Sequence, residues 1–443
     1  MKSMLAAACV AAMVTAHGSW AFAQVAMPAT PRVGTPVAQE HMGPPAPPAP
    51  IDQSLLVPRD GPLPANLTLV QALAEAAARS PAIVAARAAV AAAEGRLRQA
   101  GVRLNPELSV EVENFAGTGD YDGTRGLETT VAVNQRLDLG GRRPARLGVA
   151  RADLEAQQLR LAIARADLAQ QVREQFARAV TARDRLRLAE ENDRRARELA
   201  RIAGQLVDAG REPPLRAIRA RSAAAQIAAD LEAARAEERA SRSTLASLFG
   251  VTTPPESVVG SLVDLEPQPI DPGQSLDVRL ADIERLGAEA DLRQEQANGR
   301  LDPAVGIGVR QFSGSGDIAL VGGISMPIPI FDRNQGNISA ARANIEAAEA
   351  RRAGVLATVT VRARNAIAAV EAAEARVRAL EGAAIPEAFE ALRLAQQSYQ
   401  EGRASLLELL DTQNAYTAAE GALIDARLAL ALATAELGRV AAR

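Results

Sequence analysis

The sequence predicts a mainly helical protein with a smaller membrane-type β-sheet, built from one unit that occurs twice. Three observations predict this class: an aliphatic composition, long segments with heptad spacing, and paired segments that alternate apolar and polar residues. Of the 443 residues, 48% are hydrophobic but only 2% are aromatic. Ala, Leu, Val and Ile therefore supply nearly all of the apolar surface, which favours helices packed along narrow seams.

The charged and metal-binding residues exclude several classes of function. Lys and Arg number 50 against 53 Asp and Glu, so no global basic field attracts nucleic acid. The one Cys and two His, Cys9, His17 and His41, all precede the first predicted helix. A thiolate or imidazole metal site is therefore nearly excluded and no cofactor is expected. A hydrolytic enzyme would also lack its usual residues, since no G-x-S-x-G motif is present.

The first residues predict export. Lys2 precedes an apolar run from Leu5 to Ala16, and Ala21-Phe22-Ala23 has the pattern of a cleavage site, so we predict a signal peptide over residues 1–23. The apolar run is too short to span a bilayer as a helix. Residues 24–64 are rich in proline and are predicted to form an extended tether.

Two copies of one unit follow the tether. Short motifs of the first copy recur in the second: LNP at 104 and LDP at 301, FAG at 115 and FSG at 312, AGR at 209 and EGR at 401. The offset is 197 residues for the first two pairs and 192 for the third, and such a nearly constant offset is the signature of a duplication. We therefore expect a first repeat over 65–249, a proline-rich linker over 250–272 and a second repeat over 273–443.

Each repeat is predicted to contain a helix, two strands, a long helix, a tight turn and a final helix. The expected helices are 68–102, 142–208 and 213–249, then 274–299, 334–400 and 404–441. The expected strands are 106–115 and 127–139, then 303–312 and 318–330. A helix of about 66 residues is roughly 100 Å long. Two shorter helices laid end to end would therefore cover each long one, with the strands at one end and the turn at the other.

Apolar residues repeat every seven positions along both long helices, which indicates left-handed coiling between neighbours. These positions are Leu147, Leu154, Leu161, Leu168, Ile338, Ile345, Val359, Ala366, Ala373, Leu380 and, after a Glu, Leu394. An ordinary dimeric coiled coil would explain this spacing but not the strands. Pro386 interrupts the second long helix where the first repeat has Arg194, so we expect a bend in the second hairpin alone.

The strands have one apolar and one polar face, as in a wall between lipid and water. Glu107, Glu111 and Glu113 alternate with apolar residues and are candidate residues of a pore lumen. Their alternative role is to solubilise a wet surface, and a soluble β-sandwich is the alternative fold. Four strands are too few to close a barrel, and lipid does not tolerate open edges. Several chains must therefore share one closed wall.

Longer motifs resemble the TolC-like outer-membrane efflux factors, from about residue 65 to the end. YQEGRASLLELLD at 399–411 resembles the second hairpin tip of that family. Three further motifs resemble its heavy-metal-cation branch, of the cobalt-zinc-cadmium type: NPELSVEVENF at 105–115, LDLGGRR at 137–143 and PIPIFDRNQG at 327–336. Because motifs at barrel-to-helix junctions are structural, antibiotics or other organic compounds remain alternative cargoes.

The resemblance implies a homotrimer in the outer membrane, whose twelve strands form a β-barrel in lipid and whose twelve helices form a periplasmic tunnel. It also implies a periplasmic adaptor and an inner-membrane pump of the resistance-nodulation-division (RND) type as partners. Such a protein conducts passively and is not an enzyme. A periplasmic adaptor or a structural coiled-coil protein is a more distant alternative, which two hairpins and membrane-type strands disfavour.

The resemblance also suggests functional residues at the hairpin tips. The acidic residues that narrow the closed end in this family match Glu408 and Asp411, which the repeat aligns with Arg216 and Arg219. We hypothesise that these charges pair between adjacent tips and close the resting tunnel; a favourable interaction with the helix dipole is the alternative role of the acids. The predicted adaptor contacts are Gly210, Arg211, Gly402, Arg403 and Ser405, with ordinary turn chemistry as the alternative for the glycines.

Overall fold

The computed structural model describes residues 61–260 and 270–442, all of which fall in one compact unit of the chain. The predicted signal peptide over 1–23 lies outside the described residues. So do most of the predicted tether over 24–64 and part of the predicted linker over 250–272.

The described residues form eight α-helices, a four-stranded sheet and a small two-stranded sheet. In chain order the elements are β1 (Asn66–Leu67), α1 (Leu69–Arg79), α2 (Pro81–Gly101), β2 (Glu107–Glu113), η2 (Gly119–Tyr121), β3 (Glu128–Arg136), α3 (Arg142–Asp208), α4 (Pro214–Ser247), β4 (Ser257–Val258), η3 (Pro272–Gln274), α5 (Leu276–Asn298), β5 (Ala304–Phe312), β6 (Ile318–Ser325), α6 (Gln335–Ala379), η4 (Leu380–Ala384), α7 (Ile385–Gln400) and α8 (Leu406–Val440).

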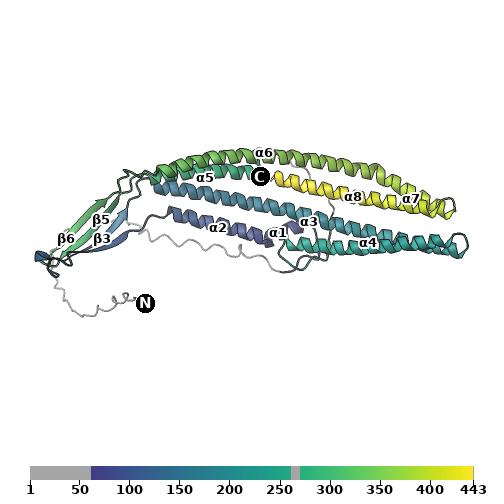
Figure 1. Cartoon of the computed structure of the whole chain (residues 1–443), viewed down its shortest axis with the longest axis horizontal. Helices are drawn as coiled ribbons and strands as arrows, with labels where there is room; N and C mark the ends of the chain where they lie inside the picture. Colours follow the sequence, from purple (N-terminus) through teal and green to yellow (C-terminus); the bar gives the residue numbers. More distant parts are fainter. Residues whose placement is uncertain (1–60, 261–269, 443) are drawn as a thin grey trace, which may run out of the picture. The chain divides into compact units, whose positions relative to one another are not determined.

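Each long helix is flanked by shorter helices laid end to end (Figure 1). Helix α3 has 67 residues and packs against α2 and α4, whereas α6 packs against α5 and α8. Alanine dominates the buried positions of both long helices. Small side chains let helix axes approach closely, which is why so few aromatic residues suffice for this core.

Two joints hold the short helices end to end. At the first, Phe249, Leu245 and Ile83 are buried together between the end of α4 and the start of α2. At the second, the backbone N–H of Leu276 donates to the carbonyl of Ala442 at 3.3 Å. The N-terminus of α5 thus meets the end of α8, so the helix dipoles continue in the same direction across the joint.

Arg439 fixes the second joint. It is only 6% exposed, and its guanidinium donates two hydrogen bonds to Asp277, at 2.9 and 3.1 Å, and one to Asp167. Burial opposes the charged form, but these hydrogen bonds outweigh it and raise the pKa of Arg439. One side chain therefore connects α8, α5 and α3.

The helix predicted over 68–102 is two helices. Helix α1 ends at Arg79, and α2 starts with Pro81 in its first turn. Proline at this position has no N–H to lose but disfavours helical backbone in the residue before it, so Ser80 leaves the helical conformation, with a ψ of 121°. Pro81 is visible in the sequence and indicates this break. The prediction of one continuous helix was wrong.

Pro386 also alters its helix, through a wider turn. The five residues of η4 form a π-helical turn immediately before it, in which the Ile385 N–H donates to the Leu380 carbonyl. A π-turn inserts one residue and shifts all later positions around the helix. Leu392 and Tyr399 are consequently buried, whereas Leu394, which we predicted on the seam, is 49% exposed.

The large sheet has the order β2-β3-β5-β6 and is antiparallel throughout. Strands β3 and β5 join the two repeats across its centre. Strand β6 ends at Ser325, so the strand predicted over 318–330 is too long, because Pro327 and Pro329 have no N–H to donate to a ladder. Strand β3 likewise ends at Arg136 rather than at residue 139.

Replacing Arg439 with Met should lower the thermal stability of the detergent-solubilised protein. The change leaves Asp277 and Asp167 without their partner, at a cost of about 1–3 kcal/mol. Circular dichroism at the helical band during heating would measure the effect. Arg427→Met is the matched control, because Arg427 and Glu381 form an exposed pair at 2.7 Å, worth about 0–1 kcal/mol. Equal melting temperatures for both variants would contradict this role of Arg439.

Candidate functional site

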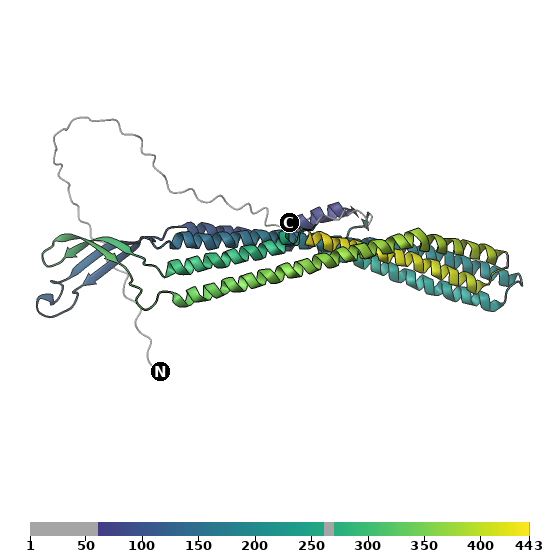
Figure 2. The same ribbon diagram turned by 90° about the horizontal axis from the view of Figure 1, so that it is seen from above.

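The four-stranded sheet has two uncovered faces of opposite character. Directly opposite residues of an antiparallel pair share a face, so the strand register assigns every side chain. The apolar face carries Leu108, Val110, Val112, Val131, Val133, Ile307, Val309, Ile318, Leu320 and Ile324, each between 45% and 79% exposed. The polar face carries Glu107, Ser109, Glu111, Glu113, Glu128, Thr130, Asn134, Arg136, Gly306, Gly308 and Arg310. The sheet extends beyond the helices (Figure 2).

The polar face is the crowded side of the sheet. A Cβ atom at Gly306 would lie under 3 Å from the side chain of Asn134, and one at Gly308 would be 2.5 Å from the Cβ of Ala132. Side chains converge in this way on the concave side of a curved sheet, which in a barrel is the inside. Glycine is needed at Gly308, where a Cβ would also lie 2.6 Å from the Val131 carbonyl oxygen, whereas at Gly306 the Asn134 side chain could move aside.

An ionic cluster crosses the polar face at the end of the strands away from the helices. Arg310 donates to Thr130 Oγ1 and to Glu128 Oε2, both at 2.9 Å, and its Nη2 lies 3.0 Å from Glu113 Oε2. The predicted Glu107, Glu111 and Glu113 thus share one face, but only Glu113 takes part in this cluster. Arg310 and Glu128 were missed, because their contact joins strands of different repeats.

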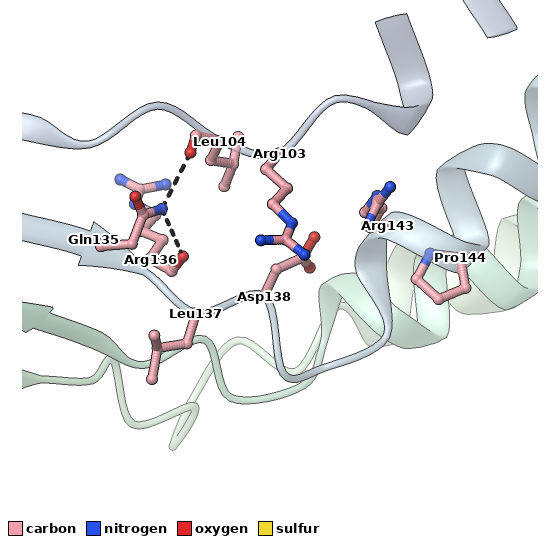
Figure 3. Close-up of a pocket in the computed structure, with 8 residues that line it drawn as sticks. All are labelled: Arg103, Leu104, Gln135, Arg136, Leu137, Asp138, Arg143 and Pro144. Atoms are coloured by element: carbon pink, nitrogen blue, oxygen red, sulfur yellow. Dashed lines mark hydrogen bonds between the residues drawn. The ribbon is translucent and has the colours of Figure 1, made fainter. Parts of the chain in front are cut away.

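The junction between sheet and helices contains a basic hollow of about 490 Å³ (Figure 3). It is lined by Arg103, Arg136 and Arg143, with Asp138 at one side. Gln135 closes the sheet side by donating to the carbonyls of Leu104 and Arg136 at 3.1 and 3.0 Å. Most of these residues belong to the sequence motif at 137–143 or adjoin it.

The junction motifs act by joining the long helices to the end of α5. Arg142, at the start of α3, pairs with Asp302 at 2.6 Å and donates to the carbonyl of Asn298 at 2.9 Å. Asn334, before α6, donates to the carbonyl of Glu295 at 2.8 Å. A Cβ at Gly299 would lie 2.7 Å from the Arg333 carbonyl. These residues perform packing, and among the described residues no cluster of potential metal ligands is found.

Both hairpin tips end their long helix in the same way. Gly210 and Gly402 have positive φ angles of 71° and 74°. Arg211 N–H donates to the Leu206 carbonyl and Arg403 N–H donates to that of Ser398, at 2.8 and 2.7 Å. This is the Schellman motif, for which glycine is the preferred residue. Turn chemistry therefore accounts for both glycines, and their contact with an adaptor remains a prediction.

The proposed gate residues lie at these tips without contacting one another within the chain. Glu408 and Asp411 are exposed on α8, where Ser405 caps the helix by accepting from the Glu408 N–H at 3.2 Å. Arg219 is also exposed, and Arg216 pairs with Glu212 of its own tip. A latch between subunits would therefore compete with this internal pair for Arg216.

A polar and aromatic contact joins the two hairpins above the tips. The Tyr416 hydroxyl donates to Glu420 at 2.7 Å, and the Arg195 guanidinium lies 5.2 Å from the Tyr416 ring centroid. Burial and the hydrogen bond to Glu420 raise the pKa of Tyr416 to about 12. Asn192 of α3 accepts from Gln413 at 3.2 Å. These contacts between repeats were also not predicted.

Beside this contact, a hollow of about 410 Å³ lies between α3 and the second hairpin. Tyr399 lines it and is only 5% exposed. Its hydroxyl has no hydrogen-bond partner in the described part of the chain. Burial and the nearby Glu212 charge raise the pKa of Tyr399, so the group stays neutral.

A family model described as outer membrane efflux protein matches residues 72–251 and 274–443, that is, both repeats. The chain belongs to this family. It is therefore an outer-membrane efflux channel protein with its helices on the periplasmic side, and not an enzyme. The family resemblance and the location predicted from the sequence are both confirmed.

Relatives within the family carry names of metal resistance. The chain is 32% identical over 308 residues to the nickel-cobalt-cadmium resistance protein NccC of Alcaligenes xylosoxydans xylosoxydans, covering 68% of this chain and 70% of the relative. It is 30% identical over 358 residues to the cobalt-zinc-cadmium resistance protein CzcC of Cupriavidus metallidurans, covering 78% and 83%.

Solved structures share the fold. The outer membrane protein VceC of Vibrio cholerae matches with a TM-score of 0.70 at 21% identity, covering 84% of this chain and 96% of that one. CusC matches with a TM-score of 0.72 at 18% identity, covering 88% and 96%. The chain thus shares its duplicated unit of strands and long hairpins with these solved structures.

If the tips are latched by charge pairs, Arg216→Ala and Asp411→Ala should each raise the single-channel conductance in planar bilayers. Exposed pairs are worth only about 0.2–1 kcal/mol each, but symmetric copies would act together and high salt would weaken them. Arg221→Ala, an exposed arginine further along α4, is the control. Wild-type conductance in both tip variants would defeat the latch.

Proposed function

We propose that three copies of this chain form one channel with a continuous wall. This channel passively conducts divalent heavy-metal cations to the exterior. The observation that carries this proposal is the four-stranded sheet, which has one exposed apolar face, one acidic face and two edges, β2 and β6, without a partner strand in the described residues. In lipid such edges must be paired. Strand β6 of one copy pairing with β2 of the next would close the wall, and three copies would give twelve strands.

The exposed apolar surface of the helices also supports assembly of several copies. The continuous helical stretch Gln335–Gln400 contains a segment apolar enough to cross a membrane by length and composition alone, and that segment is largely exposed within one chain. Val361, Ile367 and Phe389 are 42% to 54% exposed along this stretch. Contact with neighbouring copies would bury these side chains and place the helices around a shared tunnel.

The cargo is inferred from the relatives and from charge. Three relatives are named as resistance proteins for nickel, cobalt, cadmium or zinc. Glu107 and Glu111 on the polar face would line the lumen and attract cations. Export of antibiotics or other organic compounds is the competing cargo, because the junction motifs hold helices together and do not select a substrate.

The partners follow from the same inference. A passive channel needs an energy source elsewhere, which an inner-membrane RND-type pump would provide, linked by a periplasmic adaptor. Arg211, Arg403 and Ser405 remain the proposed adaptor contacts, because they are exposed at the two tips. Cargo selection would then lie mainly with the pump.

Deletion of the gene should sensitise cells to cobalt, nickel, zinc or cadmium salts but leave the inhibitory concentrations of dyes and antibiotics unchanged. The acidic lumen and the names of the relatives both favour cations. Growth inhibition assays with and without a plasmid-borne copy would measure this. Sensitivity to organic compounds alone would support the competing cargo.

Placing a charge on either face of β6 should distinguish a membrane wall from a soluble sheet. Leu320 is on the apolar face and Val321 on the polar face, next to each other in the strand. A lipid-facing Arg costs about 2–4 kcal/mol near the bilayer midplane. Leu320→Arg should therefore reduce the yield of heat-modifiable oligomers in outer-membrane fractions, whereas Val321→Arg should not. Equal yields would mean that this face does not contact lipid.

A further inference from the structure

Charge is unevenly distributed along the polar face of the sheet. Among the described residues, its charged side chains are Glu107, Glu111, Glu113, Glu128, Arg136 and Arg310. Glu107 and Glu111 form no ion pair in the described part of the chain. At the outer end, by contrast, two carboxylates share one guanidinium, that of Arg310.

The two outer carboxylates lie next to each other on the polar face. Glu113 and Glu128 are directly opposite in the register of β2 and β3, so their Cβ atoms are about 4.5–5.5 Å apart. Two carboxylates on adjacent strands can both turn toward one divalent cation, for which carboxylate oxygens are suitable ligands. Without a neighbouring positive charge, the two carboxylates would repel each other, and binding a cation would relieve this repulsion.

We propose that Arg310 prevents this pair from capturing the exported cation and so keeps the outer end of the channel open to release. This inference rests on the proposed function, in which the polar face lines the lumen. Conduction requires that binding be weak enough for the ion to leave. Arg310 occupies Glu113 Oε2 and Glu128 Oε2, and Asn114 donates to Glu128 Oε1 at 3.3 Å. Few carboxylate oxygens remain for a passing metal ion.

The cluster is accessible, as this role requires. Glu113 is 48% exposed and Arg310 is 29% exposed, so ions can reach the pair from the polar side. Arg310 also bonds to Glu128 and to the buried Thr130, so it contributes to the stability of the sheet as well. The comparison between variants is therefore made on oligomers of the same heat stability.

Binding of Co²⁺ to the purified full-length oligomer, measured by isothermal titration calorimetry, tests the proposal. Arg310→Gln should gain about one site per chain with at least about tenfold tighter affinity than wild type. Arg310→Lys keeps the charge and should behave as wild type. The double variant Arg310→Gln with Glu113→Gln should lose the gained site, which a merely structural effect of the arginine would not produce.

A second measurement follows the channel itself. In planar bilayers with dilute KCl, where charges are least screened, micromolar Co²⁺ should reduce the cation preference of Arg310→Gln but not that of wild type. Equal Co²⁺ binding by wild type and Arg310→Gln, in oligomers of the same heat stability, would overturn the proposal. A wild-type protein that forms no channel would instead contradict the proposed function and leave the binding comparison valid.

Discussion

The need to pair the backbone N–H and C=O groups at the two edges of the four-stranded sheet is the constraint on which the rest of the structure depends. Strands β2 and β6 each have one edge of N–H and C=O groups that the described chain leaves without a strand partner. In water such an edge invites aggregation, and in hydrocarbon each unmade hydrogen bond costs several kcal/mol. The apolar face adds the same requirement, since no other element of the described residues covers it. The proposed assembly would meet both requirements, and the close approach of Gly306 and Gly308 to β3 marks the polar face as the crowded one.

The helices are too long to be stabilised by one central core. A hydrophobic core cannot be centred in helices of this length, so stability is distributed along narrow alanine-rich seams and concentrated at joints. Arg439 at the α5–α8 joint and Arg142 at the start of α3 each connect elements that are distant in sequence. Arginine suits both places because its planar guanidinium makes several directed hydrogen bonds while remaining charged. The motif around Arg142 accordingly holds α3 against the end of α5. Other residues must therefore set the cargo preference.

Much of this architecture could be predicted from the sequence, because proline, glycine and periodicity mark long helices well. The bounds of α3 are the predicted 142–208 for this reason. Leu394 was misplaced because heptad counting assumes an uninterrupted α-helix, and η4 inserts a residue. Arg310 was missed because its contact with Thr130 spans 180 residues and depends on how β3 and β5 align. Local patterns contain no information on that register between repeats.

The π-turn before Pro386 has a consequence for how the two repeats diverged. A duplicated gene begins with two equal hairpins, and the two hairpins of this chain now differ at this turn. One proline, where the first copy has Arg194, removed a backbone donor and widened a single turn. Bending there disturbs fewer intact hydrogen bonds than elsewhere in the helix. The second hairpin therefore contains one turn that is easier to bend, whereas the first repeat has a continuous α-helix at the matching place.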